Sequence, residues 1–304
     1  MEMKKLKIKK ILVPVDFSKT ASNALTQAIF IARLTGAKLK LVHIVSGEYA
    51  IPTNELNIPY GAAFYTKLQK STLASLDKLA KNIQKEHGIE TSTDVKSGVV
   101  SDAICAMAKK GKISLIVMGT HGMSGVKEFF TGSNAYKVIN HAPCPVISVQ
   151  QKPEQKIDSG IILPIRLEMN SREKVDYVVE LAKVFGCKVY IVGFTSEKNK
   201  EHRFKIKQYV KQVEDYLTGI GIENKSTTIF ADNFTKEIIQ YAKTMNVGLI
   251  AIMNEHDFSI DQLVKGSYTQ QFVNHSKVPV LSIPAVPIGE DVSSNLFASG
   301  DIPF

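Results

Sequence analysis

The chain has 304 residues, a formal net charge of +9, 44% hydrophobic residues and 22% charged residues. This length has room for about two domains that each bury a core, and the composition is typical of a soluble globular protein. No apolar run approaches the roughly 18 to 20 residues of a membrane-spanning helix, so we expect no membrane association.

The positive charge is concentrated at the start, where five of the first ten residues are lysine. Elsewhere the excess is spread thinly, without the interleaved basic and aromatic residues that stack on bases, so nucleic acid is not an expected partner. The apolar run after these lysines is short and ends at Asp16, which does not fit an export signal. Three cysteines without metal or redox spacing favour a reducing, cytoplasmic location.

Strand-like and helix-like segments alternate along the first half. A short apolar run, KILVPVDF, precedes a helix whose alanine- and leucine-rich stripe ends at Gly36. The segments expected next are a strand KLKLVHIV, a helix over residues 73–83, a weaker strand ETSTDVKSG, a helix capped by Ser101, and strands ISLIVMG and CPVISV. This alternation predicts a parallel sheet with helices on both faces, because parallel neighbours require a crossover.

The same design then repeats. Residues 160–194 follow residues 10–44 at an offset of 150, and residues 265–283 follow residues 131–149 at an offset of 134. The chain is therefore a tandem duplication. We predict an α/β fold of two tandem doubly wound, Rossmann-like domains, each with a five-stranded, mostly parallel sheet. Their predicted boundaries are 1–152 and 153–284, followed by a flexible tail, 285–304.

The offset changes because the first half has an excess segment, residues 46–65, rich in Pro, Gly and aromatic residues. This segment leaves the second strand at the carboxyl end of the sheet, where ligands bind in such folds. It is either a surface loop or a flap over the first site.

The loop MGTHGMSGVKEFFTGS, residues 118–133, joins a strand to a helix. Its glycines at 119, 122 and 132, with Ser133, have the spacing G-x2-G-x9-G-S. Glycines let a backbone approach a ligand closely, and amides at a helix start can cradle phosphate oxygens. Alternatively, the glycines only form turns. Asp16, at the end of the first strand, could reach a ribose or a phosphate-bound metal, or could cap the first helix.

This glycine spacing resembles the ATP-binding signature of the universal stress protein family, and ILVPVDFS, His43 and HAPCPV agree with it. The resemblance covers residues 8–150 closely and 157–284 more loosely. It implies an adenine nucleotide alpha hydrolase-like fold that binds ATP, with Mg²⁺ or Mn²⁺ as a companion that ATP could bring. The segments 145–149 and 279–283 would be edge strands that pair in an internal pseudo-twofold dimer, because unpaired apolar edges are a liability. A further homodimer is compatible with the resemblance.

Carried over residue by residue, the resemblance assigns the nucleotide contacts but no catalytic residue and no metal ligand. Pro14, Val15 and Asp16 would contact the nucleotide from the first strand, and Ile44 would line the adenine pocket. Met118, Gly119 and Gly122 would flank the ribose and phosphates. Gly132, Ser133 and Asn134 would hold the phosphate tail. Asn134 departs from the family pattern, in which this position is often small and apolar. His121 is expected to be an exposed loop residue, and His43 to be structural.

The second half has lost this signature. The offsets place Arg166 at the position of Asp16, Met253 at Gly119 and His256 at Gly122, whereas Gly266 and Ser267 survive. Side chains at positions that required close backbone approach would fill the pocket. The second site is therefore either decayed or repurposed for another anion, with Arg166 and His256 as ligands.

Three functions remain open. The first is an ATP-binding stress or regulatory protein whose nucleotide state alters contacts with a protein partner of unknown identity. The second is a slow ATPase or phosphoryl-transfer enzyme, although the sequence has neither a GxxxxGK[ST] loop nor an obvious poised base. The third is an interaction scaffold without nucleotide.

Overall fold

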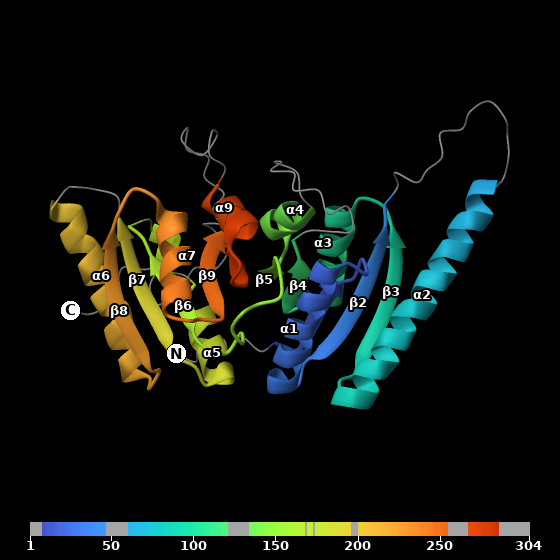
Figure 1. Cartoon of the computed structure of the whole chain (residues 1–304), viewed down its shortest axis with the longest axis horizontal. Coiled ribbons are helices and arrows are strands. Elements are labelled where there is room, and N and C mark those ends of the chain that lie inside the picture. The colour runs from blue at the N-terminus through green and yellow to red at the C-terminus, as the bar shows by residue number, and fades with distance from the viewer. Residues whose placement is uncertain are drawn as a thin grey trace, which may run out of the picture. The chain divides into compact units, whose positions relative to one another are not determined.

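The computed structural model describes residues 8–46, 60–120, 134–167, 169–172, 174–195, 200–254 and 267–285. Contacts divide the chain into an N-terminal unit, Ile8–Cys144, and a C-terminal unit that begins at Pro145. Both are α/β structures with mostly parallel strands, which confirms the predicted fold class (Figure 1). The segment 46–65 and the tail 285–304, for which the sequence makes predictions, lie mostly outside the described residues.

The N-terminal unit contains a parallel sheet in the order β3-β2-β1-β4. Its elements are β1 (Lys10–Pro14), α1 (Lys19–Thr35), β2 (Lys38–Val45), α2 (Tyr60–His87), β3 (Thr91–Ser97), α3 (Val100–Gly111), β4 (Leu115–Gly119) and α4 (Asn134–His141). The inner strands β1 and β4 are buried apolar runs, as expected when helices cover both faces. The weakly predicted β3 is less buried, and α2 packs along it (Figure 1).

The C-terminal unit repeats this order, since β8-β7-β6-β9 corresponds to β3-β2-β1-β4. Its elements are β5 (Val146–Val149), β6 (Ile161–Ile165), the 3-10 helix η2 (Met169–Arg172), α5 (Val175–Phe185), β7 (Val189–Thr195), α6 (Lys200–Gly219), β8 (Asn224–Phe230), α7 (Phe234–Thr244), β9 (Leu249–Asn254), α9 (Tyr268–His275) and β10 (Val280–Pro284). The repeated topology confirms the duplication.

Strands β5 and β10 pair antiparallel, with Ile147 opposite Leu281 and Ser148 opposite Val280. The predicted pairing of segments 145–149 and 279–283 is therefore confirmed, and each apolar strand covers the other's edge. Because of this pairing, β5 falls in the C-terminal unit. The predicted boundary at residue 152 and the pseudo-twofold arrangement of the two halves stay predictions.

Both ends of helix α1 follow the local sequence signals, whereas the start of α3 does not. Helix α1 begins after Ser18, whose Oγ accepts a hydrogen bond from the amide of Ala21 at 3.1 Å, and ends at Gly36 with φ +70°. The prediction that Ser101 caps α3 is wrong. Helix α3 begins at Val100, because the extended backbone of Val99 forms the boundary without a side-chain acceptor. Ser101 lies within the first turn, buried, and donates to Asp102 at 3.1 Å.

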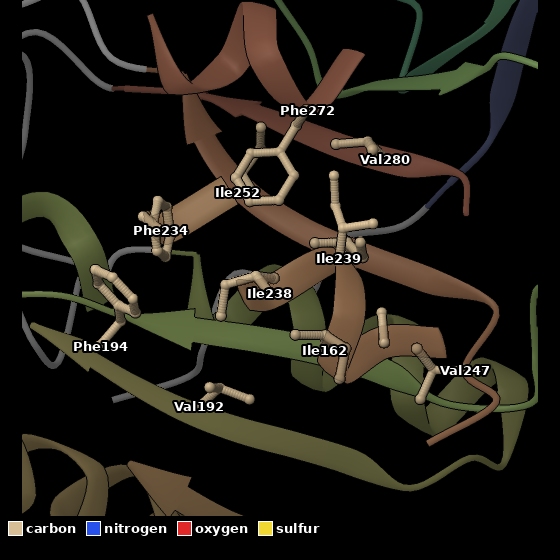
Figure 2. Packing of buried hydrophobic residues seen from close by; sticks show 12 residues of the cluster. Ile162, Val192, Phe194, Phe234, Ile238, Ile239, Val247, Ile252, Phe272 and Val280 are labelled. Carbon is tan, nitrogen blue, oxygen red and sulfur yellow. The ribbon is translucent and has the colours of Figure 1, made fainter. Parts of the chain in front are cut away.

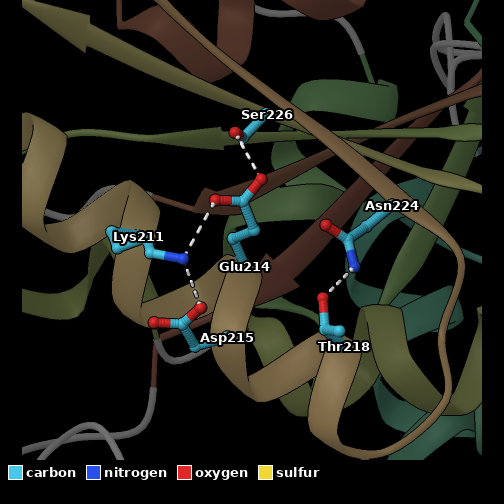
Figure 3. Close-up of polar contacts among 6 residues, drawn as sticks. All are labelled: Lys211, Glu214, Asp215, Thr218, Asn224 and Ser226. Atoms are coloured by element: carbon cyan, nitrogen blue, oxygen red, sulfur yellow. Dashed lines mark hydrogen bonds and ion pairs between the residues drawn. The ribbon is translucent and has the colours of Figure 1, made fainter.

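Side-chain hydrogen bonds connect α6 to the outer strand β8 (Figure 3). Ser226 on β8 donates to Glu214 on α6 at 2.7 Å, and the Nδ2 of Asn224 donates to Thr218 at 3.0 Å. Lys211 adds ion pairs along α6 itself, to Asp215 at 2.6 Å and to Glu214 at 3.8 Å. Lys211 and Asp215 are exposed, so these ion pairs add little stability.

None of the helices in the described part of the chain combines the length and the apolar character that crossing a bilayer requires.

Candidate functional site

The candidate site lies where the strand order of the N-terminal sheet reverses. From β1 the chain first adds β2 on one side and later β4 on the other, and Leu12 of β1 pairs with Ile116 of β4. Ligands in open α/β sheets bind beyond the carboxyl ends of the strands at such a point. The structure brings five of the predicted site residues to these two strand ends: Pro14, Val15, Asp16, Met118 and Gly119.

A tight turn follows β1 and fixes the carboxylate of Asp16. Its Oδ1 accepts a hydrogen bond from the amide of Ser18 at 2.9 Å, and the side chain is partly exposed. Ser18 itself is the N-cap of α1. Asp16 therefore does not cap α1. Its carboxylate instead shapes the turn that precedes the helix.

Sequence reasoning missed Phe17, which lies within this turn. Its backbone has φ +62°, a conformation that a bulky side chain rarely adopts, and its side chain is 50% exposed. Strain of this kind persists where neighbours enforce it, and it is frequent at binding sites. Nothing in the sequence distinguishes Phe17 except its place between Asp16 and Ser18.

His43 on β2 supports the turn from the other side. Its Nδ1 lies 2.7 Å from the carbonyl oxygen of Val15, which accepts the bond, and its ring centroid is 5.7 Å from that of Phe17. These contacts agree with the expected structural role. The neighbouring Ile44, predicted to line an adenine pocket, is partly buried on the same strand.

Gly119 ends β4 at a place where no side chain fits. A Cβ there would lie 2.8 Å from the backbone carbonyl carbon of Thr20 and 3.0 Å from the amide nitrogen of Ala21. The first turn of α1 is thus the part of the chain that approaches the backbone of Gly119 closely. The start of α1 can lie against the end of β4 because residue 119 has no side chain.

The rest of the predicted phosphate loop falls outside the described residues, namely His121, Gly122, Gly132 and Ser133. Asn134 is the first residue of α4 and is exposed. The duplicate of Ser133 is Ser267, and this residue caps α9 by accepting a hydrogen bond from the amide of Gln270 at 3.2 Å.

The corresponding place in the C-terminal unit is built differently. Met253 replaces Gly119 near the end of β9 and is 7% exposed. The neighbouring helix also starts later, since α5 begins at Val175, whereas α1 begins at the position equivalent to residue 169. The 3-10 helix η2 occupies the intervening stretch. Met253 lines a cavity at this position, and His256 lies outside the described residues.

The three cysteines are free thiols and none is activated. Burial raises the pKa of Cys144 to about 12, with Cys105 nearby as a smaller cause, and burial raises the pKa of Cys187 to about 11. Burial, and then the charge of Asp102, also raises the pKa of Cys105. A nucleophilic cysteine needs the opposite shift. Within the described residues, no group of three or more His, Cys, Asp or Glu side chains could hold a metal.

Comparison with known proteins gives consistent matches. The family model described as "Universal stress protein family" matches residues 7–150 and 161–284. Universal stress protein MJ0531 of Methanocaldococcus jannaschii is 32% identical over 49% of this chain and 85% of its own length. Universal stress protein YxiE of Bacillus subtilis is 33% identical over 46% of this chain and 98% of its own length.

A solved structure resembles nearly the whole chain. The crystal structure of a universal stress protein from Archaeoglobus fulgidus has a TM-score of 0.74 at 16% identity, covering 93% of this chain and 98% of that one. At this identity the likeness supports the fold alone.

Proposed function

Because the chain belongs to the universal stress protein family, we propose that its N-terminal half binds one ATP and regulates a protein partner according to its nucleotide state. One observation carries this proposal. The glycine signature begins at Gly119, the last residue of β4, and this strand end lies beside the end of β1 at the switch point of the sheet. We place this activity in the cytoplasm.

The residues present suit an adenine nucleotide. Asp16 is held at the end of β1 by a single bond through Oδ1, and a carboxylate in this place suits a ribose hydroxyl or a cation carried by the phosphates. Pro14, Val15 and the partly buried Ile44 offer apolar surface beside it. In this proposal Gly122, Gly132, Ser133 and Asn134 hold the phosphates through backbone amides and the start of α4.

The proposed role is binding rather than catalysis. Neither a poised base nor an activated thiol lies among the groups assigned to the site, so turnover should be far below the roughly 1 per second of slow ordinary enzymes. Steady-state phosphate release decides the alternative. Release at ordinary enzyme rates that disappears in Asp16→Asn would favour the ATPase or phosphoryl-transfer function.

The variant Gly122→His tests the site itself, because it copies the residue that the second half has at this position. A side chain there should occupy the space of ribose or phosphate, and ATP affinity measured by calorimetry on nucleotide-free protein should fall about tenfold or more. Gly125→Ser is the matched control, since it copies the second half at a position of the same loop outside the signature. Undiminished affinity in Gly122→His, or an equal loss in Gly125→Ser, would contradict the assignment.

A further inference from the structure

The start of α6 carries an aromatic side chain on its solvent-exposed face. Phe204 is 62% exposed, the largest exposed fraction among the large apolar side chains of the described residues. By contrast, the ring of Phe234 lies in the buried cluster of the same unit, with its centroid 5.0 Å from that of Phe194 and 5.5 Å from that of Phe272 (Figure 2). Core packing therefore does not explain a phenylalanine at position 204.

A second exposed ring and a cation accompany Phe204. Phe230 is the last residue of β8 and is 38% exposed. The guanidinium carbon of Arg203, the residue before Phe204, lies 4.6 Å from the ring centroid of Phe230. Stacking on a ring leaves the N–H groups of a guanidinium at its edge, where they can meet a carboxylate. One exposed ring is ordinary on a protein surface, whereas two rings with a cation suit a segment that is both acidic and apolar.

Two lysines extend this surface along α6. Lys200 and Lys207 precede and follow Phe204 by four and three residues, so they share its face of the helix. Both are exposed, and neither forms an ion pair within the described part of the chain, whereas Lys205 and Lys211 are paired with acidic residues of α6. We refer to five residues together as the basic-aromatic face: Lys200, Arg203, Phe204, Lys207 and Phe230.

The tail of this chain has the complementary composition. Residues 286–304 contain Glu290, Asp291 and Asp301 and no lysine, arginine or histidine, although the chain as a whole has a formal net charge of +9. Leu296 and Phe297 provide an apolar pair between these acidic residues. The tail lacks the periodicity of a helix or a strand, so it would bind as an extended segment.

The topology of the C-terminal unit brings the tail to the correct edge of the sheet. Strands β10, β9, β6, β7 and β8 are neighbours in this order and parallel, so their carboxyl ends share one edge. The tail leaves β10 at this edge, and α6 begins there after β7. Neighbouring strands lie about 4.8 Å apart, so β10 and β8 are separated by about 19 Å. Extended residues 286–297 span about 40 Å, which is enough to bring Phe297 to Phe204.

We propose that residues 286–304 dock on the basic-aromatic face, with Leu296 and Phe297 against Phe204 and the acidic residues beside Lys200 and Lys207. Because the tail is tethered, its effective concentration is about millimolar, and modest contacts suffice. The docked tail covers a surface that suits an acidic, apolar segment of another protein, so such a partner has to displace it. The proposal does not involve the proposed ATP site, and the two are tested separately.

Carbodiimide coupling of the full-length chain tests the contact, because this reagent joins a carboxylate to a lysine amine that touches it. Mass spectrometry should find acidic residues of the tail coupled to Lys200 or Lys207. A mixture of isotope-labelled and unlabelled chains separates coupling within a chain from coupling between chains. Coupling only to the lysines among residues 4–10, coupling mainly between chains, or no coupling of the tail would overturn the proposal.

Two variants test the chemistry of the face through the rate at which chymotrypsin cleaves the full-length chain after Phe297. Phe204→Ala removes the ring, and Lys207→Glu reverses a charge while allowing a helical ion pair with Lys211. Each variant should raise the cleavage rate about threefold or more, because proteolysis follows the population of the undocked tail. Both changes lie on an exposed face, so melting temperatures should stay close to that of the parent chain.

Lys225→Glu is the matched control. It makes the same charge change at an exposed position of β8 near the amino end of that strand, at the opposite edge of the sheet, and should leave the cleavage rate unchanged. Equal rates in the parent chain and in both variants of the face, or an equal rise in Lys225→Glu, would contradict docking on α6.

Discussion

At the scale of single residues, Gly119 and its duplicate Met253 differ together with the helix that lies beside each of them. In the N-terminal unit, the first turn of α1 lies within 3.0 Å of where a Cβ of residue 119 would be. In the C-terminal unit, Met253 fills the equivalent space and α5 starts later along the chain. The glycine is therefore needed for the fold of this site, whatever the loop after it binds.

We expect Gly119→Ala to lower the free energy of unfolding by about 1 to 3 kcal/mol, because the added methyl group overlaps backbone atoms that cannot rotate away. Gly111→Ala is the control. It has no positive φ and its Cβ would make ordinary contacts of 3.5 Å with Ile113, so it should be neutral or slightly stabilising. Urea unfolding measures both. Equal stability of Gly119→Ala and the parent chain would show that α1 does not approach β4 this closely.

The buried thiol of Cys144 and the partly buried thiol of Cys187 give a prediction about pH. The pKa of Cys144 is about 12 and that of Cys187 about 11 in the folded chain, whereas an unfolded thiol ionises near pH 8.5. The folded state thus keeps protons that the unfolded state releases, so this part of the stability is complete below about pH 8.5 and is lost as the pH rises through the folded values. Near pH 8, folded protein should react slowly with a thiol reagent and unfolded protein quickly. Equal rates would contradict the burial of these thiols.

At the scale of elements, apolar periodicity and turn chemistry predicted the strands β1, β2, β4 and β5 and the stop of α1 at Gly36, whereas the pairing of β5 with β10 followed from the family resemblance. These features depend on local patterns or on the need to cover an apolar edge. The start of α3 was misplaced because Ser101 suits a cap by type but lies on the buried face. The strained Phe17 and the late start of α5 could not be predicted, because each depends on contacts with residues distant in the sequence.

The β5–β10 pair can be tested at Ser148, which lies opposite Val280 and is buried. Ser148→Pro removes a backbone donor from an inner ladder and should cost about 3 kcal/mol or more in unfolding free energy. Ser148→Val keeps the donor and should cost far less. Hydrogen exchange of residues 146–149 provides the direct measurement. Fast exchange of these amides in the parent chain would contradict the pairing.

At the scale of the whole molecule, a single duplicated fold presents two differently built strand ends. Both units present the carboxyl ends of parallel strands at a switch point, which fixes where a ligand can bind but not which ligand. In the N-terminal unit the glycine signature follows β4, and in the C-terminal unit Arg166, Lys174 and Met253 surround a cavity too small for a nucleoside. The fold class and the duplication followed from the sequence, whereas the strand order and the contents of the second cavity required the structure.

The most direct test of this account is the number of ATP molecules bound per chain, measured by calorimetric titration of nucleotide-free, full-length protein. The account predicts one site per chain, which Gly122→His weakens and Lys174→Ala leaves intact. Two equivalent sites per chain, or no ATP binding at all, would contradict it.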